Sequence, residues 1–381
     1  MNINSFLCYL LLALVSVSYM PGVLYTPLYD IASNLMLLCV VVGVVANKKN
    51  INKQIFRSMK NYILYVLIIC TLIFLIYQEN ITGILPHFVL PFAFFLMGFA
   101  KKNISDKDVF LCQLTFVAFA LIMGLLNVRS TGGFVIQDMY VVALKNSSGA
   151  ILGTAAIISI ALFIGQDKLI PKYLAGFSAF LLIICLLTFR NRSTLVGFLL
   201  AVTLLIRRSS KQVSFLKIFM ISIVAVILFA IVASMLNVSI TEYAYTSFFA
   251  NKDTSDIDDL SSGRLTNISE AWENIILADP IGANLSLKKQ LLSIDNFIVY
   301  VYANLGLFGL LAYLPLYIYL IKFVIRRIKR VDYRHLYPYL CIATLLITSI
   351  FEATFPLSPG TAVCAAYFFC GLEERIQMSN T

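Results

Sequence analysis

The stretch KYLAGFSAFLLIICLLTFRNRSTLVGFLLAVTLLIRR, residues 172–208, contains two apolar runs separated only by the short polar run from Phe189 to Ser193. A membrane-spanning helix needs about 20 apolar residues to cross roughly 30 Å of hydrocarbon. The first run, 172–189, has that length, whereas the second, 194–206, would form only about 20 Å of helix. The stretch therefore predicts a helix hairpin in a membrane, with the polar run drawn toward the bilayer.

The composition of the whole chain supports a membrane protein. The 381 residues are 60% hydrophobic and only 13% charged, whereas soluble proteins are about half apolar and about a quarter charged. The formal net charge of +10 is divided among short clusters between apolar runs, which does not favour nucleic-acid binding because that function needs one basic stripe. The eight cysteines all lie in apolar runs and are interpreted as small core residues.

We expect an all-α integral membrane protein of about twelve transmembrane helices. The whole chain, 1–381, forms one polytopic domain on this interpretation. The segment 6–19 could pass for the apolar part of a signal peptide, but no basic residue precedes it, so we expect it to belong to the first span. The predicted spans are 4–20, 24–46, 61–77, 84–100, 109–127, 147–165, 172–189, 194–206, 215–236, 297–321, 337–351 and 360–372.

Lys and Arg residues indicate the orientation of these spans, because cytoplasmic loops carry an excess of both. The basic residues concentrate in every second loop, and the predicted topology assigns 21 of the 29 to one face. Both termini are therefore expected in the cytoplasm. The break at Ser358-Pro359-Gly360 leaves a second option for the last two runs, a re-entrant hairpin that returns the C-terminus to the same side.

The only long polar stretch, residues 237–296, forms a large loop outside the cytoplasm on this topology. Helical spacing of apolar residues from Leu265 to Ile276 predicts a short helix on the membrane surface, with Ser262 as a possible cap and Pro280 after its end. The acidic run 253–259 resembles the metal-binding triplet of some glycosyltransferases. We interpret it as a solvated loop, and we expect no metal and no cofactor.

Three arginines are candidates for binding phosphate. Arg190, Arg192 and Arg264 face the same compartment on the predicted topology. Arginine suits bidentate phosphate recognition, and the start of a helix near Arg264 would favour an anion further, so together they would suit a pyrophosphate. A second interpretation is that Arg190 and Arg192 only anchor the hairpin at the lipid headgroups.

Two carboxylates are candidates for a general base. Asp295 lies where the large loop re-enters the membrane, where partial burial would raise its proton affinity; it could equally cap the tenth span. Glu352 lies between the last two spans and is expected to pair with one of the arginines. Lys145, Asn146 and Asn296 are candidate contacts to sugar or phosphate, although helix capping explains Asn146 equally well.

The chain resembles the O-antigen polymerase and ligase superfamily. The resemblance runs from about residue 140 to 356 and is carried by an ordered set of short motifs: Lys145-Asn146…Gly149, Arg192-Ser193…Gly197, Gly263-Arg264…Trp272…Pro280…Gly282, Asp295-Asn296…Gly306…Gly309 and Glu352. It implies a glycosyltransferase of the C-type (GT-C-like) membrane architecture in the bacterial inner membrane, with its loop in the periplasm. Ligases of this superfamily typically carry His where this chain has Asp295, which favours a polymerase.

On this resemblance, the substrates are oligosaccharide repeat units linked to undecaprenyl pyrophosphate, and no nucleotide sugar is used. Arg190, Arg192 and Arg264 would stabilise the departing pyrophosphate, and Asp295 or Glu352 would accept the proton of the attacking hydroxyl. A chain-length regulator protein is a possible partner. An O-antigen ligase that transfers polymer to lipid A-core is the first alternative, and a transporter or flippase for the same lipid-linked sugar is the second.

Overall fold

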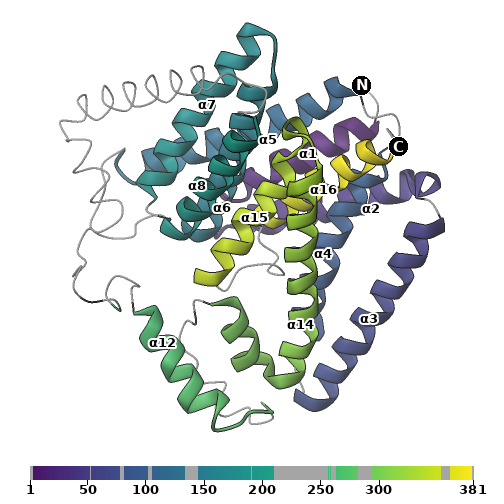
Figure 1. The fold of residues 1–381 in the computed structure, drawn as a ribbon, viewed down its shortest axis with the longest axis vertical. Coiled ribbons are helices and arrows are strands. Elements are labelled where there is room, and N and C mark those ends of the chain that lie inside the picture. Colours follow the sequence, from purple (N-terminus) through teal and green to yellow (C-terminus); the bar gives the residue numbers. More distant parts are fainter. Residues whose placement is uncertain are drawn as a thin grey trace.

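The computed structural model describes residues 3–51, 53–77, 81–101, 105–133, 145–189, 191–209, 256, 258, 263–281, 294, 296–352 and 361–379. Throughout this described part the chain is helical (Figure 1). The helices are α1 (Ile3–Val17), α2 (Pro27–Ala46), α3 (Lys53–Tyr77), α4 (Ile81–Phe99), α5 (Asp106–Ser130), α6 (Lys145–Gly165), α7 (Leu169–Thr188), α8 (Arg192–Ser209), α12 (Arg264–Ala271), α14 (Phe297–Arg330), α15 (Tyr337–Phe351) and α16 (Thr361–Ser379). Short turns η1 (Lys48–Asn50) and η3 (Tyr333–His335) are 3₁₀ helices, and η2 (Trp272–Ile276) is a π-helical turn.

Five of the described helices are long and apolar enough to cross a membrane, namely α2, α5, α6, α7 and α14. Shorter apolar helices lie within α1, α3, α4 and α15. These nine helices coincide with nine of the predicted spans. The predicted spans 194–206 and 360–372 correspond to α8 and α16, which are not in this set, and the helix predicted at 215–236 lies outside the described residues. The fold class predicted from the sequence, a helical protein compatible with the membrane, is confirmed at this level.

Exposed apolar side chains form continuous stripes on the outer helices. On α2 they recur at three- and four-residue spacing, at Leu28, Ile31, Leu35, Leu38, Val42 and Val45, while another face of the helix buries Ala32, Met36, Cys39 and Gly43. Soluble monomers rarely expose contiguous apolar patches of this kind. These stripes are the surfaces that hydrocarbon would cover.

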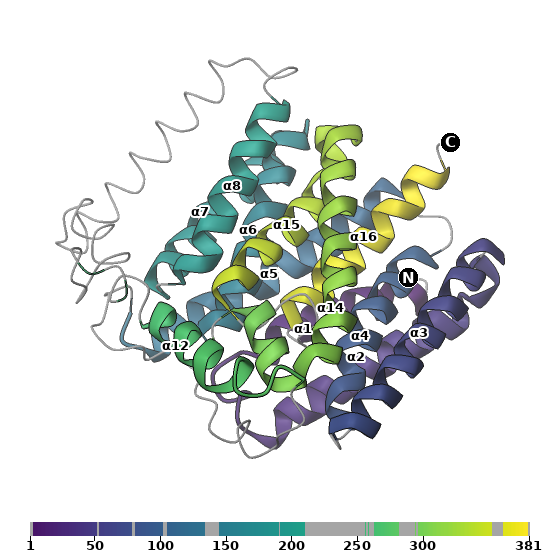
Figure 2. The ribbon, with the colours of Figure 1, turned by 60° about the horizontal axis from the view of Figure 1, so that its bottom comes forward.

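The interior of the bundle depends on close helix contacts. α6 is enclosed along most of its length, with α7, α5, α8 and α15 packed around it, and α16 packs against α4 (Figure 2). A Cβ on Gly98 of α4 would lie 2.1 Å from the Phe368 carbonyl oxygen, and one on Gly371 of α16 would lie 1.9 Å from the Phe95 carbonyl oxygen. Small residues therefore let these two backbones touch, as is common between membrane helices.

Helix α14 differs from the predicted span 297–321 in two ways. It continues nine residues further, to Arg330, because the basic segment after residue 321 keeps the helical backbone although it is too polar to count as membrane span. It is also broken at Gly306, whose φ of 63° and ψ of −168° are not helical. The freed Leu307 N–H donates to the Ile281 carbonyl at 3.3 Å, which fastens the loop segment to the break.

The bundle has two chemically different ends. At one end, side-chain contacts join the ends of α8, α14 and α16 and the turn η3. Arg208 donates to the Ile328 carbonyl, Arg327 pairs with Glu374, and His335 pairs with Glu373. We call this the basic end, since it also carries the Lys322–Arg330 cluster. The starts of α6, α8 and α14 and the ends of α7 and α15 lie at the opposite end.

Candidate functional site

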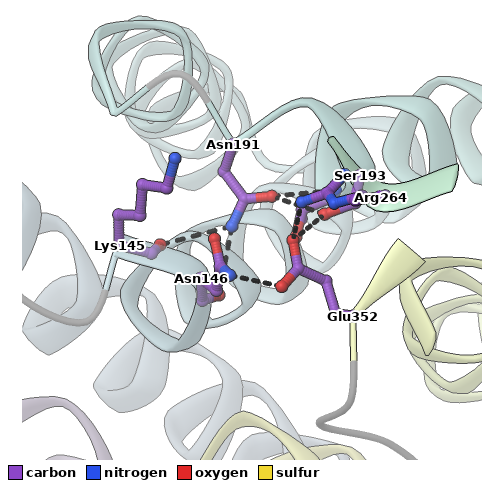
Figure 3. Close-up of polar contacts among 7 residues, drawn as sticks. Lys145, Asn146, Asn191, Ser193, Arg264 and Glu352 are labelled. Carbon is purple, nitrogen blue, oxygen red and sulfur yellow. Dashed lines mark hydrogen bonds and ion pairs between the residues drawn. The ribbon is translucent and has the colours of Figure 1, made fainter. Parts of the chain in front are cut away.

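A buried carboxylate lies at that opposite end. Glu352 directly follows the last turn of α15 and is 2% exposed. Its Oε1 accepts hydrogen bonds from Ser193 Oγ at 3.0 Å and from Arg264 Nη2 at 3.2 Å, and its Oε2 accepts one from Asn146 Nδ2 (Figure 3). Donors from α6, α8 and α12 therefore replace the water that burial removes from this carboxylate.

Asn191 connects the starts of α8 and α6 beside Glu352. It immediately precedes α8, and its Oδ1 accepts from the Thr194 backbone N–H at 3.0 Å, which caps the helix. Its Nδ2 donates to the backbone carbonyls of Lys145 and Asn146, at 3.2 and 3.1 Å. Ser193 Oγ lies 3.0 Å from both Asn191 Oδ1 and Glu352 Oε1, so its single proton can serve one of the two at a time.

Two glycines bring the helices close enough for these bonds. A Cβ on Gly149 of α6 would lie 2.4 Å from Asn191 Nδ2, and a Cβ on Gly197 of α8 would lie 2.8 Å from the Thr344 carbonyl oxygen of α15. The Asn191 side chain and the α15 backbone occupy the space that these side chains would fill. Gly149 and Gly197, both part of the motifs described above, therefore have a packing role that was not predicted from the sequence.

Arg264 reaches Glu352 from the polar loop. It begins α12, whose N-cap is Gly263 with φ of +74°, a conformation that favours glycine. This corrects the sequence prediction of a Ser262 cap; Ser262 lies outside the described residues. α12 and η2 pack on the first segment of α14 through a small apolar cluster, where Trp272 and Tyr302 make an edge-to-face contact. The loop helix is therefore held against the bundle at the depth of Glu352.

Electrostatics within the described cluster favour an anion. Three basic residues, Lys145, Arg192 and Arg264, are the first residues of α6, α8 and α12, and Arg264 is the one in contact with the Glu352 carboxylate. The Arg264–Glu352 pair has side-chain exposures of 22% and 3%, so it is shielded from water and little screened by salt. Among these four charged side chains the basic ones outnumber the carboxylate, although the loop helix beside them also carries Glu270 and Glu273.

The structure brings some of the predicted site residues together and not others. Glu352, Asn146 and Arg264 are in direct contact, and the expected pairing of Glu352 with an arginine is present. Lys145 contributes its backbone carbonyl to Asn191, and its side chain points away from Glu352 (Figure 3). Arg192 is partly buried as the first residue of α8. Arg190 and Asp295 lie outside the described residues.

Asn296 has a capping role in this structure. Its Oδ1 accepts from the Ile298 and Val299 backbone N–H groups, both at 3.1 Å, so it caps α14. Its Nδ2 donates to the Ile350 carbonyl at 2.9 Å, two residues before Glu352. The start of α14 is thereby tied to the end of α15, beside the cluster but not within it.

The acidic run of the loop contributes one structural contact. Asp258 accepts from the Thr266 backbone N–H at 3.1 Å and from the Thr266 hydroxyl, both in the first turn of α12. This described part of the run therefore anchors the helix that carries Arg264. The remaining acidic residues, apart from Asp256, lie outside the described part of the chain.

Asn191 and Ser193 were not predicted as site residues, although Ser193 belongs to the Arg192-Ser193 motif. Asn followed by Ser before an apolar run is a capping signal, but it does not reveal that the same amide reaches α6. A scan of protein-family models and a search of the curated proteins find no match to this chain.

Proposed function

We propose that this chain polymerises undecaprenyl-pyrophosphate-linked oligosaccharide repeat units at the periplasmic face of the bacterial inner membrane. On this proposal it crosses the membrane about twelve times, with both termini and the basic end in the cytoplasm. The observation that carries the proposal is the buried Glu352, held by Arg264, Ser193 and Asn146 at the end of the bundle away from the basic cluster. The resemblance of the motifs supplies the substrate class.

The proposed reaction is a glycosyl transfer. A hydroxyl of one lipid-linked repeat unit attacks the anomeric carbon of the glycan on another carrier, the bond to the pyrophosphate breaks, and undecaprenyl pyrophosphate leaves with that electron pair. The hydroxyl proton passes to a protein carboxylate. Because negative charge develops on the leaving group, the guanidinium groups of Arg192 and Arg264 are the features of the site that would favour the transition state.

The contacts of Glu352 suggest different roles for the two candidate carboxylates, Glu352 and Asp295. Both oxygens of Glu352 already accept hydrogen bonds and the residue is 2% exposed, so little of the carboxylate is open to a substrate hydroxyl. We therefore assign Glu352 to positioning Arg264, and Asp295 to accepting the proton. The bond from Asn296 to the Ile350 carbonyl supports this division, because it ties the residue next to Asp295 to the end of α15.

The test is complementation of a strain that lacks the gene, with wild type, Arg192→Ala, Arg264→Ala and a control, Arg129→Ala. Arg129 is an exposed arginine in the last turn of α5, outside the cluster. The readouts are a silver-stained ladder of surface polysaccharide, mass analysis of the undecaprenyl-linked pool and the amount of each variant in the membrane. We expect the two cluster variants to leave lipid A-core carrying a single repeat unit, while Arg129→Ala restores the ladder.

Two other outcomes would identify a different function. Long lipid-linked chains with uncapped core, in the absence of the gene, would indicate a ligase, and repeat units retained on the cytoplasmic leaflet would indicate a flippase. A normal ladder from both Arg192→Ala and Arg264→Ala would refute the role of these arginines in binding pyrophosphate.

A further inference from the structure

Helix α14 carries one exposed stripe that changes from apolar to basic. The stripe follows positions three or four residues apart, at Leu311, Pro315, Ile318, Lys322, Arg326 and Arg330, and Tyr319 is exposed beside it. Two adjoining hollows lie along it. The first is lined by Leu311, Leu314, Pro315, Ile318, Tyr319 and Lys322, and the second by Tyr319, Lys322, Phe323, Arg326, Arg327 and Arg330. Because they share Tyr319 and Lys322, they form one groove, which we call the α14 groove.

The dimensions of the α14 groove fit one leaflet of a bilayer. With 1.5 Å of rise per residue, its apolar part from Leu311 to Lys322 is about 16 Å long. That is close to half of a hydrocarbon core of roughly 30 Å. The basic part from Lys322 to Arg330 adds about 12 Å and would extend through the headgroup region.

Charge in the basic half is only partly compensated within the protein. Arg327 pairs with Glu374 and lies over the Phe323 ring, 5.7 Å from its centroid. No ion pair of Lys322, Arg326 or Arg330 occurs with any described residue. These three cations, each four residues from the next, are therefore available on one face of the helix to an external anion.

We propose that the α14 groove binds an anionic phospholipid of the cytoplasmic leaflet. An acyl chain lies along Leu311, Pro315 and Ile318, and the phosphate meets Lys322, Arg326 and Arg330. Tyr319, 64% exposed and stacked on Phe323 at 6.4 Å, stands at the boundary between the two halves, where aromatic rings are enriched in membrane proteins. A soluble acidic partner would match the cations but would leave the apolar half of the groove without an occupant.

The groove lies at the basic end, away from Glu352, so its occupancy can be measured separately from glycosyl transfer. The experiment uses the full-length protein in detergent and native mass spectrometry with added phosphatidylglycerol. Phosphatidylcholine with the same acyl chains and inorganic phosphate serve as the comparison ligands. The variants are Lys322→Gln/Arg326→Gln/Arg330→Gln and, as a matched control, Lys329→Gln, which is exposed on the same turns but does not line the groove.

Each basic side chain near an anionic surface is worth a factor of about five in affinity. We expect the wild type to prefer phosphatidylglycerol to phosphatidylcholine at its tightest site, and the triple variant to lose on the order of a hundredfold of that affinity. Lys329→Gln should bind as the wild type does. Equal binding of the two lipids by the wild type overturns the proposal, even if the triple variant fails to fold. Three other results would also overturn the proposal. The triple variant could bind phosphatidylglycerol as tightly as the wild type, Lys329→Gln could lose as much affinity as the triple variant, or inorganic phosphate alone could displace the lipid.

Discussion

Glu352 is a carboxylate that the fold removes from water, and three donors replace the hydration that it loses. A buried ion pair contributes little compared with apolar packing, but removal of one partner leaves an uncompensated charge. The conformation of this end of the bundle is therefore sensitive to each donor. That sensitivity gives Arg264 a structural role that can be separated from any role in binding substrate.

Arg264→Ala is expected to lower the free energy of unfolding by about 3 kcal/mol, the lower end of the range for breaking a buried pair, because Ser193 and Asn146 still donate. Thermal unfolding in detergent measures the loss. The double variant Arg264→Ala/Glu352→Gln should recover part of it, since the unpaired charge is gone. If the double variant is less stable than Arg264→Ala alone, the ion pair is not the cause.

For individual residues, the sequence predicted that Glu352 pairs with an arginine, but it did not predict which arginine. The three donors come from residues 88 to 206 positions away along the chain. Nothing in the local pattern around Glu352 indicates them. Asn191 was hidden because a capping residue signals only the helix that it caps, and Ser193 because its partner Glu352 is 159 positions away along the chain.

Helix α8 positions the site. It packs closely between α6 and α15 because small residues lie at the contacts. Thr344 Oγ1 donates to the Gly197 carbonyl at 3.2 Å, at the point where the α8 and α15 backbones touch. Any side chain at position 197 would force these helices apart, and the force would reach Ser193 one turn away. Helix spacing and site geometry are thus coupled.

Gly197→Ala is expected to destabilise the protein by about 1–3 kcal/mol, because its Cβ would meet backbone that has no room to move. Gly165→Ala is the matched control, since a Cβ there meets nothing within 4 Å, and it should change stability by no more than about 0.5 kcal/mol. Thermal midpoints of the two variants decide the matter. Equal midpoints would show that α8 and α15 are not packed as closely as described.

The connection between α14 and α15 makes stability depend on pH. The pKa of His335 is raised, chiefly because Glu373 on α16 accepts a hydrogen bond from its ring; the Nδ1–Oε1 distance is 3.0 Å. Because the native pKa is raised, the protonated His335 stabilises the folded state. This contribution is fully present below the unfolded pKa of about 6.5, and it is lost as the pH rises through the native pKa. We expect His335→Gln to reduce the fall in thermal midpoint between about pH 6 and pH 8.5. An unchanged fall would contradict the pairing.

Elements were predictable where hydropathy alone defines them. The span predicted at 337–351 coincides with α15, which begins with Tyr337-Pro338 and ends before Glu352. Hydropathy failed at α14, because the helix continues into the basic segment where no hydrocarbon is needed. The break at Gly306 was equally hidden, since a glycine within an apolar run does not signal which conformation it adopts.

For the whole molecule, the orientation predicted from Lys and Arg can be tested by cysteine labelling. All eight native cysteines are buried, so an impermeant maleimide should react little with the parent protein. Ser130→Cys and Asp167→Cys place exposed thiols at opposite ends of the bundle. We expect Ser130→Cys to be labelled from the periplasm in cells with a permeable outer membrane, and Asp167→Cys only after the inner membrane is opened. The reverse pattern would place Glu352 on the cytoplasmic side.

The most direct test of the account compares two buried carboxylates at opposite ends of the bundle. Glu352 pairs with Arg264, and Glu374 pairs with Arg327 at the basic end. Glu352→Gln and Glu374→Gln are expressed in the strain that lacks the gene, matched for protein in the membrane, and the polysaccharide ladder is measured. The account predicts that Glu352→Gln abolishes chain elongation and leaves single repeat units, whereas Glu374→Gln elongates normally. A full ladder from Glu352→Gln would contradict it.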